Sequence, residues 1–194
     1  MQMRGRAAIR RALVLSVMTV ATVIVVVSPA SAAREEAPDP SGVDHCVADV
    51  VDQTSDGELV LGEARCFGTF SEALTEASGG AVSLALETPG SAVFTDDLVG
   101  KLAGSFTLGI HFDGYNGGGS SISISGSSCS GGYWNAVGWW GNRISSSWNG
   151  CYHLRHYDNP SKSGSSFNTY GGGQIDNISS WFNNRTESVA YYSW

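Results

Sequence analysis

Polar and apolar positions divide this chain into one long apolar run near its start and several short alternating runs after residue 105. Residues 12–27 are almost continuously apolar. Residues 107–112 and 121–125 alternate between apolar and polar side chains, and residues 152–157 continue the pattern. Glycine clusters separate these runs, at 117–119, 131–132 and 171–173. Short alternating runs between glycine-rich turns predict strands of a β-sandwich or β-barrel.

The first 32 residues have the three parts of a secretory signal peptide. Four arginines precede the apolar run, and Ala30-Ser31-Ala32 supplies small residues for cleavage. The alternative is a permanent membrane anchor. The apolar run is about 16 residues long, shorter than the ~20 that a spanning helix prefers, and no cluster of Lys or Arg follows it. We therefore expect residues 1–32 to be removed, which leaves a secreted, extracellular protein without stable membrane anchoring.

Residues 33–100 show a different pattern. Residues 33–43 are acidic and lack periodicity, so we expect a disordered leader. A Ser55-Asp56-Gly57 turn between apolar stretches predicts a β-hairpin, and Thr69 with Glu72 predicts a capped helix over residues 71–77. Residues 44–100 are thus predicted to form a small disulfide-bonded hairpin and helix segment. This segment is a candidate pro-region, mini-domain or cap on the alternating part of the chain.

Charge and tryptophan are spread unevenly along the chain. Residues 1–32 hold four of the 11 Lys and Arg and none of the 18 Asp and Glu, so the remainder carries a net charge of about −11. Fourteen of the acids lie in residues 33–100, whereas all six Trp lie in residues 101–194. This contrast indicates two structural units. An acidic chain also lacks the basic face that nucleic acid or an anionic membrane requires.

The cysteines divide in the same way, with Cys46 and Cys66 in the first part and Cys129 and Cys151 in the second. An even number of cysteines in an exported chain indicates disulfides, and no zinc-type spacing is present. Three pairings are open. Pairing within each part is favoured, because each bridge then closes a loop of about 20 residues and contributes about 3 kcal/mol by restricting the unfolded chain.

Two segments of the alternating part repeat each other. Phe112-Asp113-Gly114 and Tyr157-Asp158-Asn159 both open with an aromatic residue and Asp, and in both a Gly seven residues after the aromatic precedes Ser-Ser. The same order continues to Asn142-Arg143 in one copy and Asn184-Arg185 in the other. The copies are 45 residues apart at their start and 42 apart at the Asn-Arg element. Matches in the same order indicate a true internal repeat.

This repeat resembles the βγ-crystallin superfamily, especially its secreted bacterial members, over residues 105–194. The resemblance implies a mainly β fold, in which two Greek-key motifs form a βγ-crystallin-like sandwich, here preceded by the hairpin and helix segment. Each motif of the family carries an Asn/Asp-Asn/Asp-x-x-Ser/Thr-Ser calcium signature, and calcium prefers roughly six to eight oxygen ligands. Carried over by position, the implied ligands are the side chains of Asn142, Ser145, Asn184 and Glu187 and the carbonyl groups of Arg143 and Arg185.

Both copies depart from the family pattern. Gly117 and Lys162 stand where a second aromatic residue of the opening motif is expected, and Gly141 stands at the first signature position of the first copy. Glu187 replaces Ser or Thr in the second copy but keeps an oxygen. We therefore expect any calcium binding to be weak. The alternative is that residues 142–146 form a tight turn whose polar side chains bond to the backbone.

Histidine and serine do not form a catalytic pattern. His153 and His156 are three residues apart on a predicted strand and so face opposite sides, and His111 is isolated. We expect strand or surface histidines, not metal ligands. No G-x-S-x-G turn is present, and residues 101–194 hold only four acids. The chain is therefore expected not to be an enzyme.

Aromatic residues between the last two cysteines suggest a binding surface. Tyr133, Trp134, Trp139 and Trp140 lie there, although such residues also fill sandwich cores. Some bacterial relatives in the family inhibit extracellular metalloproteinases, so the leading hypothesis is a secreted, non-catalytic binding protein that inhibits an extracellular protease. The alternatives are a calcium-binding structural module of the cell envelope or spore surface, and a carbohydrate-binding protein whose partner is a polysaccharide.

Overall fold

The computed structural model describes residues 44–85, 106–171 and 173–193, together with positions 42, 88, 90, 94, 98, 101 and 102. The expected signal peptide, nearly all of the expected acidic leader and much of residues 86–105 lie outside the described residues. The described residues belong to one compact unit, Glu36–Trp194. None of its described helices is long and apolar enough to cross a membrane.

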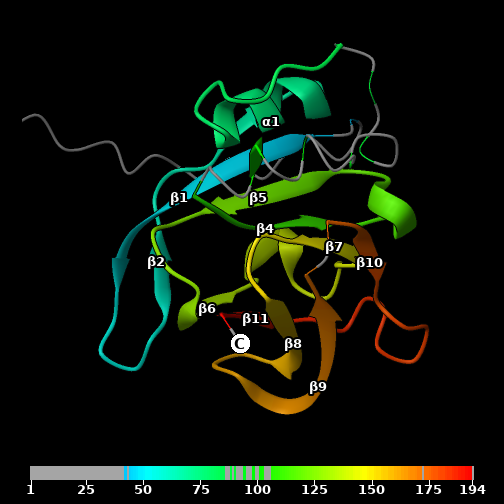
Figure 1. Ribbon diagram of the computed structural model, residues 1–194. Coiled ribbons are helices and arrows are strands. Elements are labelled where there is room, and N and C mark those ends of the chain that lie inside the picture. The colour runs from blue at the N-terminus through cyan, green and yellow to red at the C-terminus, as the bar shows by residue number, and fades with distance from the viewer. Residues whose placement is uncertain are drawn as a thin grey trace, which may run out of the picture. The chain divides into compact units, whose positions relative to one another are not determined.

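Two β-sheets and the helix α1 (Phe70–Ala77) form the layers of the described structure (Figure 1). Two short 3-10 helices, η2 (Tyr115–Gly117) and η3 (Gly138–Trp140), lie in its loops. The first sheet contains β1 (His45–Gln53), β2 (Leu59–Leu61), β3 (Arg65–Phe67), β4 (Thr107–Phe112), β5 (Ser121–Ser125), β7 (Ser146–Asn149) and β10 (Ile175–Asn177). The second contains β6 (Ser130–Asn135), β8 (His153–Asn159), β9 (Ser163–Tyr170) and β11 (Ser188–Tyr192). Their orders are β10-β7-β4-β5-β1-β2, with β3 also paired to β1, and β6-β11-β8-β9.

Residues 107–192 confirm the predicted pair of Greek-key motifs. β4 to β7 form the first motif and β8 to β11 the second. Phe112 pairs with Ser146 in the first, and Tyr157 pairs with Ser188 in the second. Each motif contributes one strand to the sheet of the other motif: β6 of the first motif pairs with β11, and β10 of the second motif pairs with β7. The two copies of the sequence repeat thus form two equivalent motifs related by a pseudo-twofold axis, and the fold is a βγ-crystallin-like sandwich.

Residues 45–67 extend the first sheet, where the sequence indicated a unit of its own. β1 runs parallel to β5, with Cys46 opposite Ile122, and its other edge pairs with β2 and β3. Cys46 and Ala48 belong to the core between the sheets. The predicted hairpin is present, but the first half of its first strand, residues 45–48, is buried in the sandwich. Composition did not reveal this, because parallel pairing joins segments far apart in the sequence.

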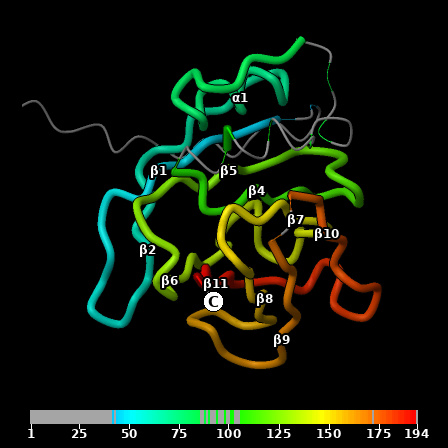
Figure 2. Tube along the Cα trace, in the orientation of Figure 1, coloured from blue at the N-terminus to red at the C-terminus, as the bar shows by residue number. Residues whose placement is uncertain are grey.

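The tip of the β1–β2 hairpin reaches the second sheet (Figure 2). The backbone N–H of Tyr133 donates to Gly57 O at 2.9 Å. The Asn135 amide donates to the Glu58 carboxylate at 2.8 Å. The hairpin therefore contacts both sheets of the sandwich at one end.

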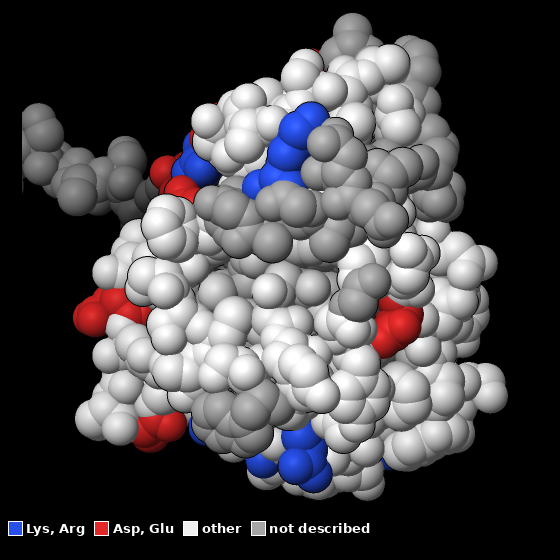
Figure 3. Space-filling view, viewed as in Figure 1, with Lys and Arg blue, Asp and Glu red and all other residues white. Residues whose placement is uncertain are grey.

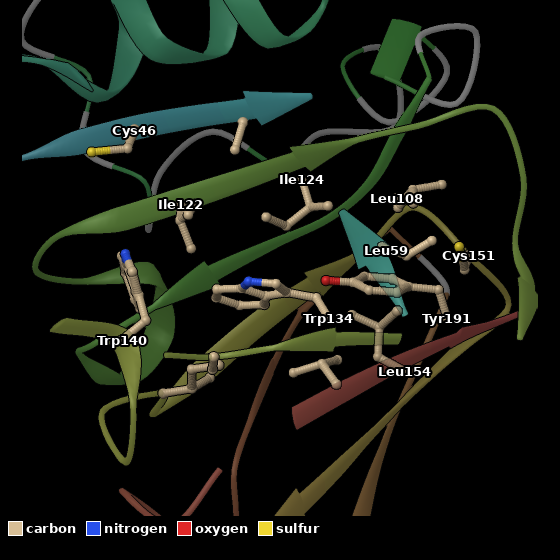
Figure 4. Close-up of a cluster of buried hydrophobic side chains, with 14 of the residues drawn as sticks. Cys46, Leu59, Leu108, Ile122, Ile124, Trp134, Trp140, Cys151, Leu154 and Tyr191 are labelled. Atoms are coloured by element: carbon tan, nitrogen blue, oxygen red, sulfur yellow. The ribbon is translucent and has the colours of Figure 1, made fainter. Parts of the chain in front are cut away.

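The core is divided between the two sides of the first sheet. Between the sheets, Ile122 and Ile124 face Trp134, Leu154 and Tyr191 (Figure 4). On the other side, Phe70 and Leu74 of α1 belong to a cluster with Ile110, Phe112 and Trp148. β4 is buried along its whole length because both of its faces are covered.

Two local predictions are confirmed. Thr69 is the N-cap of α1, as predicted, because its Oγ1 accepts the N–H of Glu72 at 3.3 Å. The Glu72 carboxylate accepts from the Thr69 hydroxyl at 2.9 Å, whereas the predicted capping box has it accept the Thr69 backbone N–H. Cys46 is bonded to Cys66 and Cys129 to Cys151, so the favoured pairing within each part is the one present.

Candidate functional site

The hairpins that open the two motifs are held by the same contacts. Asp113 Oδ1 accepts the backbone N–H of Ser120 at 2.8 Å, and Asp158 Oδ1 accepts that of Ser165 at 2.7 Å. The glycines before these serines have φ values of 74° and 79°. A Cβ at either glycine would overlap the aspartate carboxylate. Each hairpin therefore requires glycine for two reasons, the positive φ and the lack of space for a side chain.

The two arginines of the Asn-Arg elements bind these aspartates. Arg143 Nη2 donates to Asp113 Oδ2 at 3.1 Å, and Arg185 Nη2 donates to Asp158 Oδ2 at 2.8 Å. The aspartate side chains are only 16% and 14% exposed. Each ion pair joins the Asn-Arg loop of a motif to the opening hairpin of the same motif. These side-chain roles were not predicted, although Asp and Arg recur at equivalent places in the repeat and so offered a signal.

The Asn-Arg loops of the two motifs lie side by side. The N–H of Asn142 donates to Thr186 O at 2.9 Å, and the N–H of Asn184 donates to Ile144 O at 3.3 Å. Both asparagines have left-handed backbones, with φ of 59° and 56°. Asn tolerates this conformation better than most residues, because its short polar side chain bonds locally. The two loops therefore meet in equivalent ways at the pseudo-twofold.

Four of the predicted calcium ligands meet as two pairs at this crossing. Asn142 Nδ2 lies 2.8 Å from Glu187 Oε1, and Ser145 Oγ lies 3.1 Å from Asn184 Oδ1. Ser145 Oγ is also 2.8 Å from Asp113 O. A hydroxyl has one proton and donates to one acceptor at a time. The Asn184 side chain presents its oxygen, and not its NH₂ group, to Ser145. One of the two Ser145 contacts therefore brings two oxygens together without a hydrogen between them, and a cation bound there would stabilise that arrangement.

The donor set fits calcium by its chemistry, though with little negative charge. Glu187 is the one carboxylate of the four side chains, and among the described residues no group of three or more His, Cys, Asp or Glu is placed to hold a metal. The second loop also contains two buried oxygens, Asn183 Oδ1 and Thr186 Oγ1, that have no hydrogen-bond partner within the described part of the chain. Calcium accepts amide, hydroxyl and carbonyl oxygens. The ligand roles, including those of the Arg143 and Arg185 carbonyls, stay predictions.

The aromatic residues of the second disulfide loop do not form the expected binding surface. Tyr133, Trp134 and Trp140 are 2%, 6% and 7% exposed. Trp134 and Trp140 pack in the core between the sheets, and Tyr133 lies under the tip of the β1–β2 hairpin. Trp139 is half-buried, with the Arg143 guanidinium 4.0 Å from its ring centroid. The expected exposure of Tyr133, Trp134 and Trp140 is wrong, because these large aromatic side chains are buried.

A row of aromatic rings that was not predicted crosses the outer face of the second sheet. Tyr192, His153 and Tyr170 are direct neighbours in the register of β11, β8 and β9. The His153 ring centroid lies 4.8 Å from that of Tyr192 and 5.9 Å from that of Tyr170. Tyr152 adjoins the row and is 62% exposed, and Tyr170 is 55% exposed. Strand alternation hints at the row, but the pairing of three distant strands creates it.

His111 and His156 lie in the core between the sheets, with ring centroids 5.9 Å apart and no exposed surface. His111 bonds to Ser147 Oγ at 2.8 Å and to Tyr191 Oη at 3.0 Å. Burial lowers the pKa of His156 to about 3 and holds the pKa of His111 well below its ordinary value. Both are therefore neutral at pH 7. His153 faces the other side of β8, as the alternation predicted.

The sequence matches no protein-family model and no curated protein. Among solved structures, the chain is similar to a βγ-crystallin domain from Clostridium beijerinckii at 16% identity and a TM-score of 0.36, over 45% of this chain and 99% of that domain. It is similar to a double mutant of that domain at 17% identity and a TM-score of 0.37, over 44% and 97%. The fold assignment rests on the strand pairing of this chain itself.

Proposed function

We propose that this protein is a secreted, non-catalytic module of βγ-crystallin type whose sandwich is stabilised by calcium, and that it serves as a structural component of a cell envelope or spore surface. The observation that carries the proposal is the pairing of Asn142 with Glu187 and of Ser145 with Asn184. Each pair takes one residue from each motif. A bound ion supplies positive charge between oxygens of the two loops, and so favours the assembled sandwich.

Weak binding is sufficient for this role. Extracellular calcium modules have dissociation constants of about 10⁻⁴ to 10⁻³ M, and few carboxylates give low affinity. An ion that binds the native state and not the unfolded chain stabilises by mass action, by about 2.7 kcal/mol at a hundredfold excess over the dissociation constant. One carboxylate, Glu187, supported by neutral oxygens therefore suits a structural ion better than a calcium sensor.

Thermal unfolding in EDTA and in excess calcium tests the proposal. We expect calcium to raise the melting temperature by about 5 °C. Glu187→Gln keeps a carbonyl oxygen but removes the charge, so it should lose most of this gain. Asp176→Asn makes the same charge change on β10 and should keep the gain. A melting temperature that does not change with calcium would contradict the proposal. So would a calcium-dependent rise in Glu187→Gln equal to that of the unchanged protein.

Two disulfides support the proposal of export, because such bridges persist in oxidising compartments. The leader is expected to be cleaved after Ala32. Mass spectrometry of the protein recovered from the culture medium should then find a chain that begins at Ala33. A chain that retains residues 1–32, or that stays in the cells, would contradict export.

Carbohydrate binding is a second candidate function, favoured by the aromatic row on the outer face of the second sheet. Exposed tyrosine rings stack on sugar rings, and Tyr152 and Tyr170 both offer exposed surface. Affinity electrophoresis in gels that contain cell-wall or storage polysaccharide tests this function. Tyr170→Ala should abolish retardation, whereas Phe106→Ala, an exposed aromatic outside the row, should keep it. Equal migration with and without polysaccharide would exclude it for the glycans used.

Protease inhibition is the least supported candidate. The hypothesis comes from the family resemblance and uses the aromatic side chains of the second disulfide loop as its inhibitory surface, but Tyr133, Trp134 and Trp140 are buried. A buried side chain cannot enter a protease cleft without rearrangement of the sandwich. Assays against a panel of secreted proteases at micromolar protein test the activity, and uniform lack of inhibition would remove the candidate.

A further inference from the structure

β1 extends beyond the strand that it pairs with on one side. Its parallel register with β5 ends at Asp49, whereas its register with β2 continues to Gln53. After β5 the chain leads through residues 126–128 to the second sheet. No backbone hydrogen bond joins this segment to residues 50–53 in the described structure. One edge of residues 50–53 therefore has no strand partner among the described strands.

A groove of about 210 Å³ lies along this free edge. Its lining comprises Val50, Val51, Asp52, Gln53, Leu59, Leu108, Gly126, Ser127 and Ser128. A break in the register between Val50 and Asp52 accompanies the exposure of Val51, which is 65% exposed. Gly126 keeps the groove open, because a Cβ there would lie 3.0 Å from both Leu108 and Val50. The groove thus combines an open backbone edge with aliphatic walls.

The groove lies in an acidic part of the molecule. Residues 49–63 contain five carboxylates and no Lys or Arg. Asp49 is paired with an arginine, and Asp56 and Glu58 bond to side chains of β6, with Lys162 close to Asp56 at the hairpin tip. Asp52 lines the groove and accepts the backbone N–H of the next residue at 2.8 Å. Figure 3 shows acidic side chains on the side of the molecule where β1 and β2 lie. Asp52, the carboxylate in the lining of the groove, therefore favours a positively charged ligand there.

The geometry points to a docking site for an extended, positively charged peptide segment of a partner protein, which adds to the free edge of β1 as a further strand. In strand addition the main chain supplies hydrogen bonds, and alternate side chains enter pockets. The free edge of residues 50–53 spans about 13 Å at ~3.3 Å per residue. One aliphatic side chain of the segment fits between Leu59 and Leu108, and its Lys or Arg neighbours face Asp52. The site is separate from the crossing loops, so it does not depend on calcium.

Fluorescence polarisation with the oxidised protein tests the site, using a labelled peptide of about seven residues that alternates Lys and Val. We expect a dissociation constant below about 1 mM at low salt, which rises as salt is added. A Glu and Val peptide should not bind. The Lys and Val peptide with Pro at its centre should bind at least tenfold more weakly, because Pro cannot donate to a ladder.

Protein variants locate the binding. Asp52→Asn keeps the acceptor for the adjacent N–H and should weaken the peptide about threefold. The matched Asp176→Asn on β10 should leave binding unchanged. Ser128→Trp fills the groove and should abolish binding, and near-ultraviolet circular dichroism checks that this variant is folded.

Amide hydrogen exchange supplies a direct readout of strand addition. We expect the bound peptide to slow exchange at residues 50–53. Equal binding of the Pro-containing peptide, equal loss in Asp52→Asn and Asp176→Asn, protection confined to other segments, or no binding at all would each overturn the proposal.

Discussion

Arg185 Nη2 lies 2.8 Å from Asp158 Oδ2, and this ion pair fixes the loop that carries Glu187 to the hairpin that opens the second motif. The first motif repeats the contact with Arg143 and Asp113. The same carboxylates also accept backbone N–H groups of the hairpins. Each aspartate thus links the opening hairpin of its motif to the Asn-Arg loop that supplies candidate calcium ligands.

Removal of the Asp158 carboxylate should destabilise the protein more than removal of its arginine partner. Asp158→Ala removes both the ion pair and the hydrogen bond that the carboxylate accepts from the Ser165 N–H, and a hydrogen bond to a charged group contributes about 1.5–3 kcal/mol. Arg185→Ala removes an ion pair whose arginine side chain is 48% exposed, which costs less than about 1 kcal/mol. Urea unfolding of both variants measures the difference. A larger loss for Arg185→Ala would contradict this role of the aspartate in the hairpin.

Substitution of Gly164 should destabilise the protein more than substitution of a glycine that also has a positive φ but has room for a side chain. Gly164→Ala combines a positive φ with overlap between Cβ and the Asp158 carboxylate. At Gly138, φ is 64° and nothing lies within 4 Å of an added Cβ, so Gly138→Ala should cost about 1 kcal/mol from backbone strain alone. We expect Gly164→Ala to exceed this cost by at least about 1 kcal/mol. Equal unfolding free energies would contradict the expectation.

The buried histidines should make the protein sensitive to acid. In the unfolded chain His156 titrates near its ordinary pKa of about 6.5, whereas in the folded protein its pKa is about 3. As pH falls below 6.5, the unfolded state binds a proton that the native state does not, so stability is lost by up to about 1.4 kcal/mol per pH unit for this group until pH approaches 3.

Urea unfolding of His156→Gln between pH 7 and pH 4 tests this linkage. The variant should lose less stability on acidification than the unchanged protein. His153→Gln, on the outer face of the same strand, is the matched control and should keep the steep loss. An unaltered slope in His156→Gln would show that other groups cause the acid sensitivity.

Residues 44–67 should be needed for a folded sandwich. β1 covers one edge of β5 and contributes Cys46 and Ala48 to the core, so a chain that begins at Phe106 loses this strand and the α1 layer. We expect that chain to aggregate or to lack a cooperative unfolding transition. Size-exclusion chromatography and circular dichroism measure both properties. A monomeric, cooperatively folded product would support a removable pro-region instead.

The sequence predicts the parts of this fold that local chemistry determines. The Asp, Gly and Ser-Ser of the repeat act within one hairpin, and the N-cap contact between Thr69 and Glu72 acts within one helical turn, so both are visible in the sequence. Pairing of β1 with β5 and the row formed by Tyr192, His153 and Tyr170 join distant segments, so periodicity did not reveal them. The predicted surface at Trp134 and Trp140 is wrong, because composition does not distinguish an exposed aromatic loop from a core strand.

The proposed function depends on oxygen ligands paired across the crossing loops, and a calcium titration followed through backbone amide chemical shifts examines that pairing residue by residue. We expect shifts concentrated at residues 142–145 and 184–187, with both loops responding at the same calcium concentration and Glu187→Gln weakening the response. Absence of shifts in the millimolar range, or shifts confined to the acidic residues 49–63, would contradict the pairing.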